Sequence, residues 1–293
     1  MSALAVGTVR NFVDLTKPRL MPLVLFSGLP IMAMPPSGWA PLSTIVLIML
    51  GIALTAAAAN TLNAYLEIDR DSLMERTRGR PLPAGRIEPG HALAFGIALA
   101  GFSVAFLYAI GGLSAAVCGL AGIIIYAFVY TVWLKPRSAW NVFVGGVAGA
   151  ISPLIADLAL NGTIGPAGWC VFGLVFLWQP PHVWAIALYR KAEYEAAGIR
   201  MLPSVLGDTP TRWWMLICTL VLVPVTLAPA WIGLLGDLYI VLALVANAAF
   251  IWASIQLVRL KSVAAARRMF RVSLGYLFAV LGAMLLDVAF GGG

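Results

Sequence analysis

Apolar runs long enough to cross a lipid bilayer recur along almost the whole of this 293-residue chain. A bilayer-spanning helix needs about 20 predominantly apolar residues, and 61% of the chain is hydrophobic whereas only 11% is charged. The runs predict membrane-spanning helices at residues 20–34, 42–71, 92–110, 113–134, 140–160, 166–189, 213–235, 239–257 and 272–290. The sequence therefore predicts an all-α, polytopic membrane protein whose nine transmembrane helices surround a central cavity.

The Lys and Arg residues fall on alternate connections between these helices. With nine spans, the N-terminal segment lies on the same side of the membrane as the connections after the second, fourth, sixth and eighth spans. These segments, together with Arg70 at the adjoining end of the second span, contain all 19 Lys and Arg residues. Positively charged connections mark the cytoplasmic side, so we expect a cytoplasmic N-terminus and an external C-terminus. The same distribution accounts for the net charge of +7, and it argues against nucleic-acid binding because no soluble domain carries the charge.

The two longest polar connections follow the second and the sixth span. Their equivalent placement, four spans apart, is typical of a duplicated helical unit that faces a shared cavity. We therefore expect residues 1–293 to form a single intramembrane domain, built from two pseudo-repeated helical halves that meet near residues 135–140.

The end of the second predicted span, which leads into the first of these connections, carries a regular series of oxygen-bearing side chains. Asn63, Glu67 and Asp71 are spaced four residues apart, and a step of four returns to nearly the same face of an α-helix. The three side chains should form a column, here called the oxygen column. Magnesium prefers a few carboxylate oxygens together with substrate phosphates. The pattern makes Asn63, Glu67 and Asp71 candidate metal ligands and catalytic residues.

A cluster of arginines without lysine follows the column, namely Arg76, Arg78, Arg80 and Arg86. A guanidinium group can bind two phosphate oxygens at once. Acidic and basic clusters this close are compatible if a divalent cation and a pyrophosphate lie between them. On this interpretation we expect a catalytic role for Arg76 and substrate binding by Arg80 and Arg86. The alternative is that these arginines only fix membrane topology, but topology requires no column of oxygen donors.

The sixth predicted span contains two consecutive prolines, Pro180 and Pro181, directly before His182. Proline removes a helical hydrogen bond, so we expect a broken helix here, and likewise at the two prolines of the first span. Irregular backbone at this depth lines a cavity or is buried in protein. His182 is therefore a candidate for contact with a substrate, although an isolated histidine is as readily a packing residue.

Charged residues begin the connection after the sixth span. Arg190 and Lys191 could hold the far side of a pyrophosphate, and Glu193, next to Tyr194, could help to hold a second cation. The alternative is an ordinary charged flank of a membrane span.

Several of these segments together resemble the UbiA-type intramembrane prenyltransferases, and within them the branch whose members farnesylate haem. The first signature of that family is similar to Asn63-x3-Glu67-x3-Asp71 with the Met74-Glu75-Arg76-Thr77 and Arg80-Pro81-Leu82 that follow it. Further segments resemble the haem-specific branch: Thr16-Lys17-Pro18-Arg19, Trp178-Gln179-x-Pro181-His182-x-Trp184, Glu193-Tyr194-x-x-Ala197-Gly198 and Met201-Leu202-Pro203. The chain departs from the family pattern at Glu67 and Glu193, where Asp is commoner, and at Arg200, where Pro is common.

The resemblance implies transfer of a farnesyl group from farnesyl diphosphate to a vinyl group of haem b, with addition of water, at a Mg²⁺ site on the cytoplasmic side of the cell inner membrane. It implies substrate binding by Lys17, Arg19, Arg80, Arg86, Gln179, His182, Arg190, Lys191, Glu193 and Tyr194. His182 would ligate haem or handle a proton, and Trp178, Trp184 and Tyr65 would line the cavity around an allylic cation. Haem A synthase and terminal-oxidase assembly factors would be partners of such an enzyme.

Two alternatives stay open at this point. A UbiA-type enzyme could use another acceptor, such as a quinone or chlorophyll precursor. A secondary transporter would also have paired halves and broken helices around a central site, but it would not need carboxylates beside arginines at the membrane edge.

Overall fold

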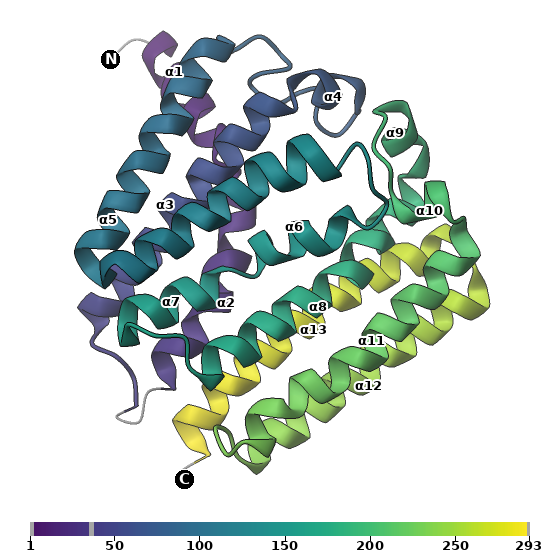
Figure 1. Ribbon diagram of the computed structural model, residues 1–293. Coiled ribbons are helices and arrows are strands. Elements are labelled where there is room, and N and C mark those ends of the chain that lie inside the picture. Colours follow the sequence, from purple (N-terminus) through teal and green to yellow (C-terminus); the bar gives the residue numbers. More distant parts are fainter. Residues whose placement is uncertain (1–2, 35–37, 292–293) are drawn as a thin grey trace.

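The computed structural model describes residues 3–34 and 38–291, and the described residues form helices and connections without a β-strand (Figure 1). The elements are α1 (Ala3–Leu15), the 3₁₀-helix η1 (Pro18–Leu20), α2 (Met21–Ala33), α3 (Leu42–Leu66), α4 (Ile68–Leu73), α5 (Pro89–Ile124), the π-helix η2 (Ile125–Leu134), α6 (Asn141–Gly149), α7 (Ser152–Asn161), α8 (Pro166–Tyr189), α9 (Lys191–Ala196), α10 (Leu202–Val205), α11 (Asp208–Trp231), α12 (Asp237–Leu260) and α13 (Val263–Phe290).

Within the described ranges, seven helices are long and apolar enough to cross a membrane. One of them, Pro89–Leu134, reverses direction at Gly112, whose φ of 73° is a left-handed conformation that glycine adopts without a steric penalty. In Figure 1, α5 accordingly forms two arms, the second of which continues into η2. Pro18–Ala33 forms a shorter apolar helix. The all-α, multi-pass architecture is thus confirmed, whereas the total of nine spans stays a prediction.

Two predicted spans are interrupted rather than continuous. The prediction of one helix over 42–71 was wrong, because α3 ends at Leu66 and Glu67 has non-helical dihedral angles (φ −112°, ψ 14°) before α4 begins. The span predicted at 140–160 consists of α6 and α7, which are separated at Ala150 and Ile151. Pro153 lies in the first turn of α7, a position at which the missing proline N–H costs no helical hydrogen bond.

The predicted proline breaks, in contrast, do not occur. Helix α8 runs without interruption through Pro180 and Pro181, and α2 runs through Pro30 while Pro22 lies in its first turn. Each internal proline removes one backbone hydrogen bond, but packing against neighbouring helices can retain the helical path within a membrane bundle. Pro180, Pro181 and Pro30 are all buried, which is consistent with that explanation.

Helices α11 and α13 begin well before the apolar runs that predicted them. Charged residues lie near their N-terminal ends, namely Asp208 and Arg212 in α11 and Arg267, Arg268 and Arg271 in α13. Hydropathy therefore marks only the part within the hydrocarbon layer. Ser262 supplies the start signal for α13, because its side chain accepts a hydrogen bond of 3.2 Å from the Ala265 N–H.

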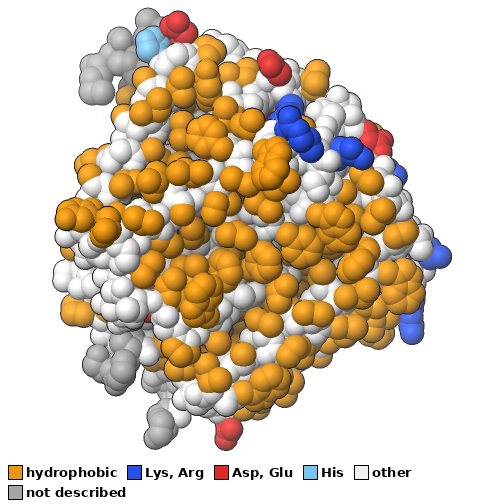
Figure 2. Space-filling model, in the orientation of Figure 1, with side chains coloured by type: hydrophobic (Ala, Val, Ile, Leu, Met, Phe, Trp, Pro, Cys, Tyr) orange, Lys and Arg blue, Asp and Glu red, His pale blue; other side chains and the backbone are white. Residues whose placement is uncertain are grey.

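The outer surface of the bundle is largely apolar. Figure 2 shows hydrophobic side chains over most of the visible face, and Lys and Arg side chains along its upper right and right edge. Large hydrophobic residues such as Leu42, Val245 and Phe290 are exposed. An apolar belt with basic residues at one end is the surface expected of a protein that lies in a bilayer.

Candidate active site

The oxygen column is present in the structure despite the break in its helix. Backbone hydrogen bonds continue the four-residue step across the break, from Glu67 N–H to the Asn63 carbonyl (3.1 Å) and from Asp71 N–H to the Glu67 carbonyl (2.8 Å). The amide of Asn63 also donates to Glu67 Oε2 at 3.0 Å. Asn63, Glu67 and Asp71 are only 1%, 4% and 5% exposed. The sequence therefore predicted the grouping correctly, although it predicted the wrong helix end.

Every member of the column has a basic partner from another part of the chain. Lys17 Nζ donates to Asn63 Oδ1 at 2.5 Å, Lys135 Nζ to Glu67 Oε1 at 2.5 Å, and Arg80 Nη1 to Asp71 Oδ2 at 2.6 Å. Lys17 precedes η1, Lys135 directly follows η2, and Arg80 lies in the connection after α4. Because buried carboxylates are stable only when they are paired, these three cations explain how the column is tolerated at the membrane edge.

Burial and mutual charge set the protonation of this cluster. Burial lowers the pKa of Lys17 to about 7, and the nearby charge of Arg80 adds to that effect. Burial alone would raise the pKa of Glu67, but the charge and hydrogen bond of Lys135, together with Lys17, hold that pKa below its usual range. Glu67 is therefore ionised at neutral pH, whereas Lys17 is only partly protonated there.

Of the four clustered arginines, the structure brings only Arg80 to the column. Arg76 and Arg78 are exposed, and their side chains take part in no hydrogen bond or ion pair within the described ranges. Arg86 is also exposed, and its guanidinium donates to Asn11 Oδ1 (3.1 Å) and to the Gly79 carbonyl (2.9 Å). Arg19 is exposed near Lys17, and its side chain makes no hydrogen bond or ion pair with any residue that the structure describes. The expected grouping of Arg19, Arg76 and Arg86 with the column is therefore not observed.

The reason lies in the segment between α4 and α5. It forms a series of turns that are anchored by the buried side chains of Leu82 and Ile87, which pack against Leu15. Consecutive turns direct neighbouring side chains differently, so arginines close in sequence do not converge on one point. Sequence proximity alone could not reveal this.

The charged residues of the second connection pair locally. Arg190 Nη1 donates to Glu193 Oε1 at 2.6 Å, and Lys191 Nζ lies 3.2 Å from Asp208 Oδ1. Tyr194 is buried in a cluster that includes Met74 of the first connection. The second connection therefore contacts the first through Tyr194. Within the described residues, the side chains of Arg190, Lys191 and Glu193 form no hydrogen bond or ion pair with the oxygen column.

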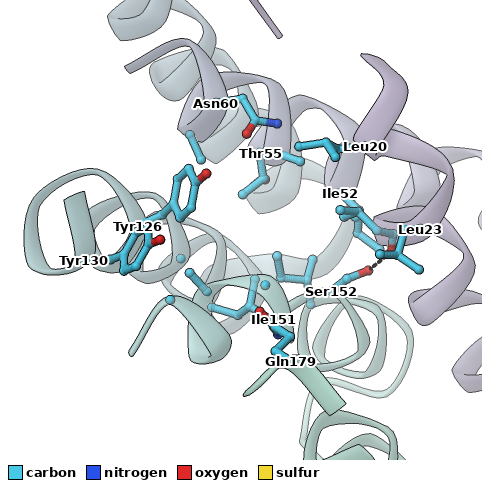
Figure 3. Close-up of a pocket in the computed structure, with 18 of the residues that line it drawn as sticks. Leu20, Leu23, Ile52, Thr55, Asn60, Tyr126, Tyr130, Ile151, Ser152 and Gln179 are labelled. Carbon is cyan, nitrogen blue, oxygen red and sulfur yellow. Dashed lines mark hydrogen bonds between the residues drawn. The ribbon is translucent and has the colours of Figure 1, made fainter. Parts of the chain in front are cut away.

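A cavity of about 330 Å³ adjoins the column. Its lining includes Asn60, which lies three residues before Asn63, and Tyr130, which is adjacent to Thr131. Thr131 contacts the column directly, because its Oγ1 accepts a hydrogen bond of 2.9 Å from the Asn63 amide. Figure 3 shows Asn60, Tyr126 and Tyr130 on one side of this cavity and Leu20, Leu23 and Ile52 on another. The cavity is thus mostly apolar, with polar groups near its column end.

Two predicted substrate contacts, Gln179 and His182, line this cavity together with Trp178. Gln179 donates to the Gly146 carbonyl at 2.9 Å, so its amide is fixed against α6. Trp184 and Tyr65 are absent from the lining. Trp184 is instead fully buried against other aromatic rings, and the prediction that it lines the cavity was wrong.

Sequence reasoning missed Tyr126, Tyr130 and Lys135, whose side chains the π-helix η2 places close together. In a π-helix the hydrogen bonds join residues five apart, and Lys135 N–H accordingly donates to the Tyr130 carbonyl at 2.8 Å. The Lys135 ammonium also lies 5.5 Å from the Tyr130 ring centre, and the two tyrosine rings stack at 5.6 Å. An α-helical projection places Tyr130 and Lys135 on different faces, which is why their spacing gave no signal.

Glycines on α6 make room for the polar lining. A Cβ atom at Gly145 would lie 2.8 Å from the Tyr130 ring, and one at Gly149 would lie 2.6 Å from Gln179 Oε1. Such distances are too short for any larger residue without a shift of the neighbour. The four-residue spacing of these glycines therefore belongs to the cavity wall.

The donor atoms of the column suit a hard cation that is shared with another ligand. No group of three or more His, Cys, Asp or Glu side chains is positioned to hold a metal ion anywhere in the described part of the chain. The column offers two carboxylates and an amide oxygen, and each already faces a positively charged group. This set fits Mg²⁺, which takes one or two carboxylates and completes its coordination with phosphate oxygens and water.

Comparison with known proteins gives matches over nearly the whole chain. The model of the UbiA prenyltransferase family matches residues 22–281. A protein named protoheme IX farnesyltransferase from Symbiobacterium thermophilum is 42% identical over 282 residues, which are 96% of this chain and 94% of that protein. A solved structure of digeranylgeranylglyceryl phosphate synthase superimposes with a TM-score of 0.79 at 16% identity, covering 96% of this chain and 98% of that chain. The UbiA homologue from Archaeoglobus fulgidus bound to DMAPP and Mg²⁺ superimposes with a TM-score of 0.65 at 18% identity, covering 93% and 99%.

Proposed function

This chain belongs to the UbiA prenyltransferase family, and we propose that it transfers a farnesyl group from farnesyl diphosphate to a vinyl group of haem b, with addition of water. The observation that carries the proposal is the buried oxygen column with its three basic partners, placed next to an apolar cavity that His182 lines. The name of the Symbiobacterium relative supports haem as the acceptor.

The diphosphate binds at the column end of the cavity. Lys135 and Arg80 supply positive charge there, and Lys17 adds to it when it is protonated. Asn63, Glu67 and Asp71 would hold Mg²⁺ at the same end of the cavity. Bound in this way, Mg²⁺ would neutralise the negative charge that develops on the leaving diphosphate. The three basic side chains act on the same charge, and because they are already in place they need not reorganise as the carbon–oxygen bond breaks.

The apolar part of the cavity receives the farnesyl chain and protects the allylic cation from water. Trp178, Tyr126 and Tyr130 present aromatic groups to this space, and such rings stabilise a cation over their faces. The haem vinyl group then bonds to the first farnesyl carbon, and the resulting cation beside the pyrrole takes up water and releases a proton. The product contains a hydroxyethylfarnesyl group, and diphosphate leaves.

The same proposal gives the protein an orientation and a setting. One domain with two pseudo-repeated helical halves would lie in the cell inner membrane, with the N-terminus and the oxygen column on the cytoplasmic side. The confinement of Lys and Arg to alternate connections supports this orientation. Haem A synthase and terminal-oxidase assembly factors are the proposed partners, since they would use the product. Arg19, Arg76, Arg86, Arg190, Lys191, Glu193 and Tyr194 stay proposed site residues that would have to approach the substrates on binding.

Product analysis tests the proposed function. The purified protein, with farnesyl diphosphate, Mg²⁺ and haem b, should yield a haem heavier by the net composition C15H26O in mass spectrometry. A parallel reaction with a quinone precursor should yield no prenylated product. Prenylation of the quinone precursor alone would exclude haem as the acceptor, and uptake of a solute into proteoliposomes without prenyl transfer would support a transporter instead.

Replacing His182 by Ala should weaken haem binding about tenfold or more and shift the haem Soret band, because an imidazole nitrogen that faces the cavity is removed. The affinity for a non-hydrolysable farnesyl diphosphate analogue should change little, since the oxygen column is intact. A haem titration beside an analogue-binding assay measures both.

His91→Ala is the matched control for that change. His91 is the other histidine of the chain, it is exposed, and its Nδ1 lies 3.4 Å from a Glu88 carboxylate oxygen. An unchanged haem spectrum and affinity in His182→Ala would exclude ligation, and loss of both ligands together would indicate a collapsed cavity.

A further inference from the structure

Ser273 of α13 contacts His182 of the neighbouring helix α8. Its Oγ lies 2.7 Å from His182 Nδ1, and its backbone carbonyl accepts a hydrogen bond of 2.7 Å from Trp178 Nε1. Ser273 is completely buried, at 0% exposure. A single residue of the last helix thus contacts two side chains that line the cavity.

The protons of this group can be placed by counting donors. Ser273 Oγ is also 2.7 Å from the carbonyl oxygen of Phe270. A hydroxyl has one proton to donate, and a carbonyl oxygen can only accept. If the hydroxyl donated to His182 instead, two acceptors would face each other at 2.7 Å without a proton between them. Both contacts are satisfied only when Ser273 donates to Phe270 and His182 Nδ1–H donates to Ser273.

The ring of His182 is a neutral imidazole in this setting. It stacks on Trp178 with the ring centres 4.3 Å apart and packs against Phe270 at 4.8 Å. No carboxylate lies within salt-bridge distance of it among the described residues, so an imidazolium would be a buried charge without a partner. A neutral imidazole has one proton, and that proton is at Nδ1.

The other nitrogen of the ring, Nε2, is therefore left with a free lone pair. It has no hydrogen-bond partner in the described part of the chain, and it is not fully enclosed by protein atoms. Since His182 is part of the cavity lining, Nε2 is the nitrogen available to a molecule in the cavity.

We propose that Ser273 is a positioning residue that fixes His182 in the Nδ1–H tautomer and so presents the Nε2 lone pair to the haem iron. The inference rests on the proposed function for the identity of the ligand, but the tautomer itself is a property of the haem-free protein. A hydrogen bond to the second nitrogen of a ligating histidine sets both its tautomer and its ring orientation. Helix α13, which is distant in sequence from the oxygen column, would thereby control the acceptor half of the site.

Nitrogen NMR of the imidazole tests the tautomer without haem. The chain has 2 histidines, so a ¹⁵N-histidine-labelled His91→Ala protein contains one imidazole to observe. We expect a protonated Nδ1 and an unprotonated Nε2. Ser273→Ala should increase the population with a proton on Nε2, whereas Ser273→Thr should retain the wild-type pattern because its hydroxyl can make the same bonds.

Ser103→Ala is the matched control. Ser103 is equally buried and donates to a carbonyl three residues earlier, that of Ala100 at 2.9 Å, but it lies on α5 and has no hydrogen bond to a histidine in the described part of the chain. It should leave the imidazole signals unchanged. A protonated Nε2 in the parent protein, or an unchanged pattern in Ser273→Ala, would overturn the proposal.

A haem titration of the same variants tests the function of the tautomer. Ser273→Ala should bind haem about tenfold to a hundredfold more weakly, with a shifted Soret band, while Ser273→Thr and Ser103→Ala should bind as the parent does. Equal haem affinity in Ser273→Ala and its parent would overturn the positioning role and leave the proposed function standing. Absence of haem binding in the parent would refute the proposed function, and with it the role of Nε2, even if the NMR pattern is as expected.

Discussion

Replacing Asp71 by Asn should lower the rate of prenyl transfer by about a hundredfold or more while the protein still folds and inserts. The side chain keeps its volume and can still accept a hydrogen bond from Arg80, which is now 2.6 Å away. What it loses is a buried negative charge that would hold Mg²⁺ against the diphosphate. Steady-state turnover at saturating Mg²⁺ and both substrates measures the loss, and the melting temperature in detergent reports on folding.

Asp69→Asn is the control for this change. The Asp69→Asn substitution removes the same charge from the same short helix α4, but the Asp69 side chain is exposed and lies outside the column. It should retain near-normal turnover. If Asp71→Asn also turned over at the wild-type rate, the oxygen column would have no part in the mechanism. Asn63→Ala should have a smaller effect than Asp71→Asn, because a neutral amide contributes less to holding a dication.

The helical architecture was predictable because the bilayer imposes it. Each span must bury its backbone hydrogen bonds within an apolar segment of fixed length, so hydropathy locates the segments. It does not locate helix ends outside the hydrocarbon layer, which is why α13 begins at Val263 rather than at Val272. Nor does it reveal whether proline breaks a helix: Pro180 and Pro181 remain within α8 because tertiary packing outweighs a local preference.

The part of the site that follows a single helical period was predictable from the sequence. Asn63, Glu67 and Asp71 follow the four-residue step, and their backbone hydrogen bonds preserve that step across the non-helical Glu67. Contacts between distant segments gave no such signal. Lys135 directly follows a π-helix, whose hydrogen-bond spacing differs from that of an α-helix, and Ser273 contacts His182 although the two are 91 positions apart in the sequence. Pairings of this kind depend on how helices pack, and no single-helix pattern encodes them.

Replacing Lys135 by Met should destabilise the protein and also nearly abolish transfer. Lys135 Nζ is 2.5 Å from Glu67 Oε1, and the two side chains are only 14% and 5% exposed. Methionine keeps most of the apolar stem, so the main change is that Glu67 becomes a buried carboxylate without its cation. Removal of one partner of a buried ion pair costs about 3–5 kcal/mol. Denaturation in detergent should reveal a loss of this size, and turnover should fall because the diphosphate also loses a positive charge.

Arg137→Met separates this effect from a simple loss of basic charge near the membrane. Arg137 lies two positions further along the chain and is exposed, and within the described residues its guanidinium donates only to the carbonyls of Val132 (3.0 Å) and Trp133 (2.9 Å). The Arg137→Met substitution should cost little stability and little activity. If Lys135→Met were as stable and as active as Arg137→Met, the ion pair with Glu67 would be without importance.

Adding Glu67→Gln to Lys135→Met distinguishes the two consequences of the lysine change. The second substitution removes the unpaired charge, and a glutamine can still accept the hydrogen bond that the Asn63 amide donates to Glu67 Oε2 at 3.0 Å. The double variant should therefore regain much of the lost stability, as expected when a buried pair is replaced by neutral groups. It should not regain activity, because the site then lacks both a cation for the diphosphate and a carboxylate for Mg²⁺. Recovery of turnover with stability would show that Lys135 serves folding alone.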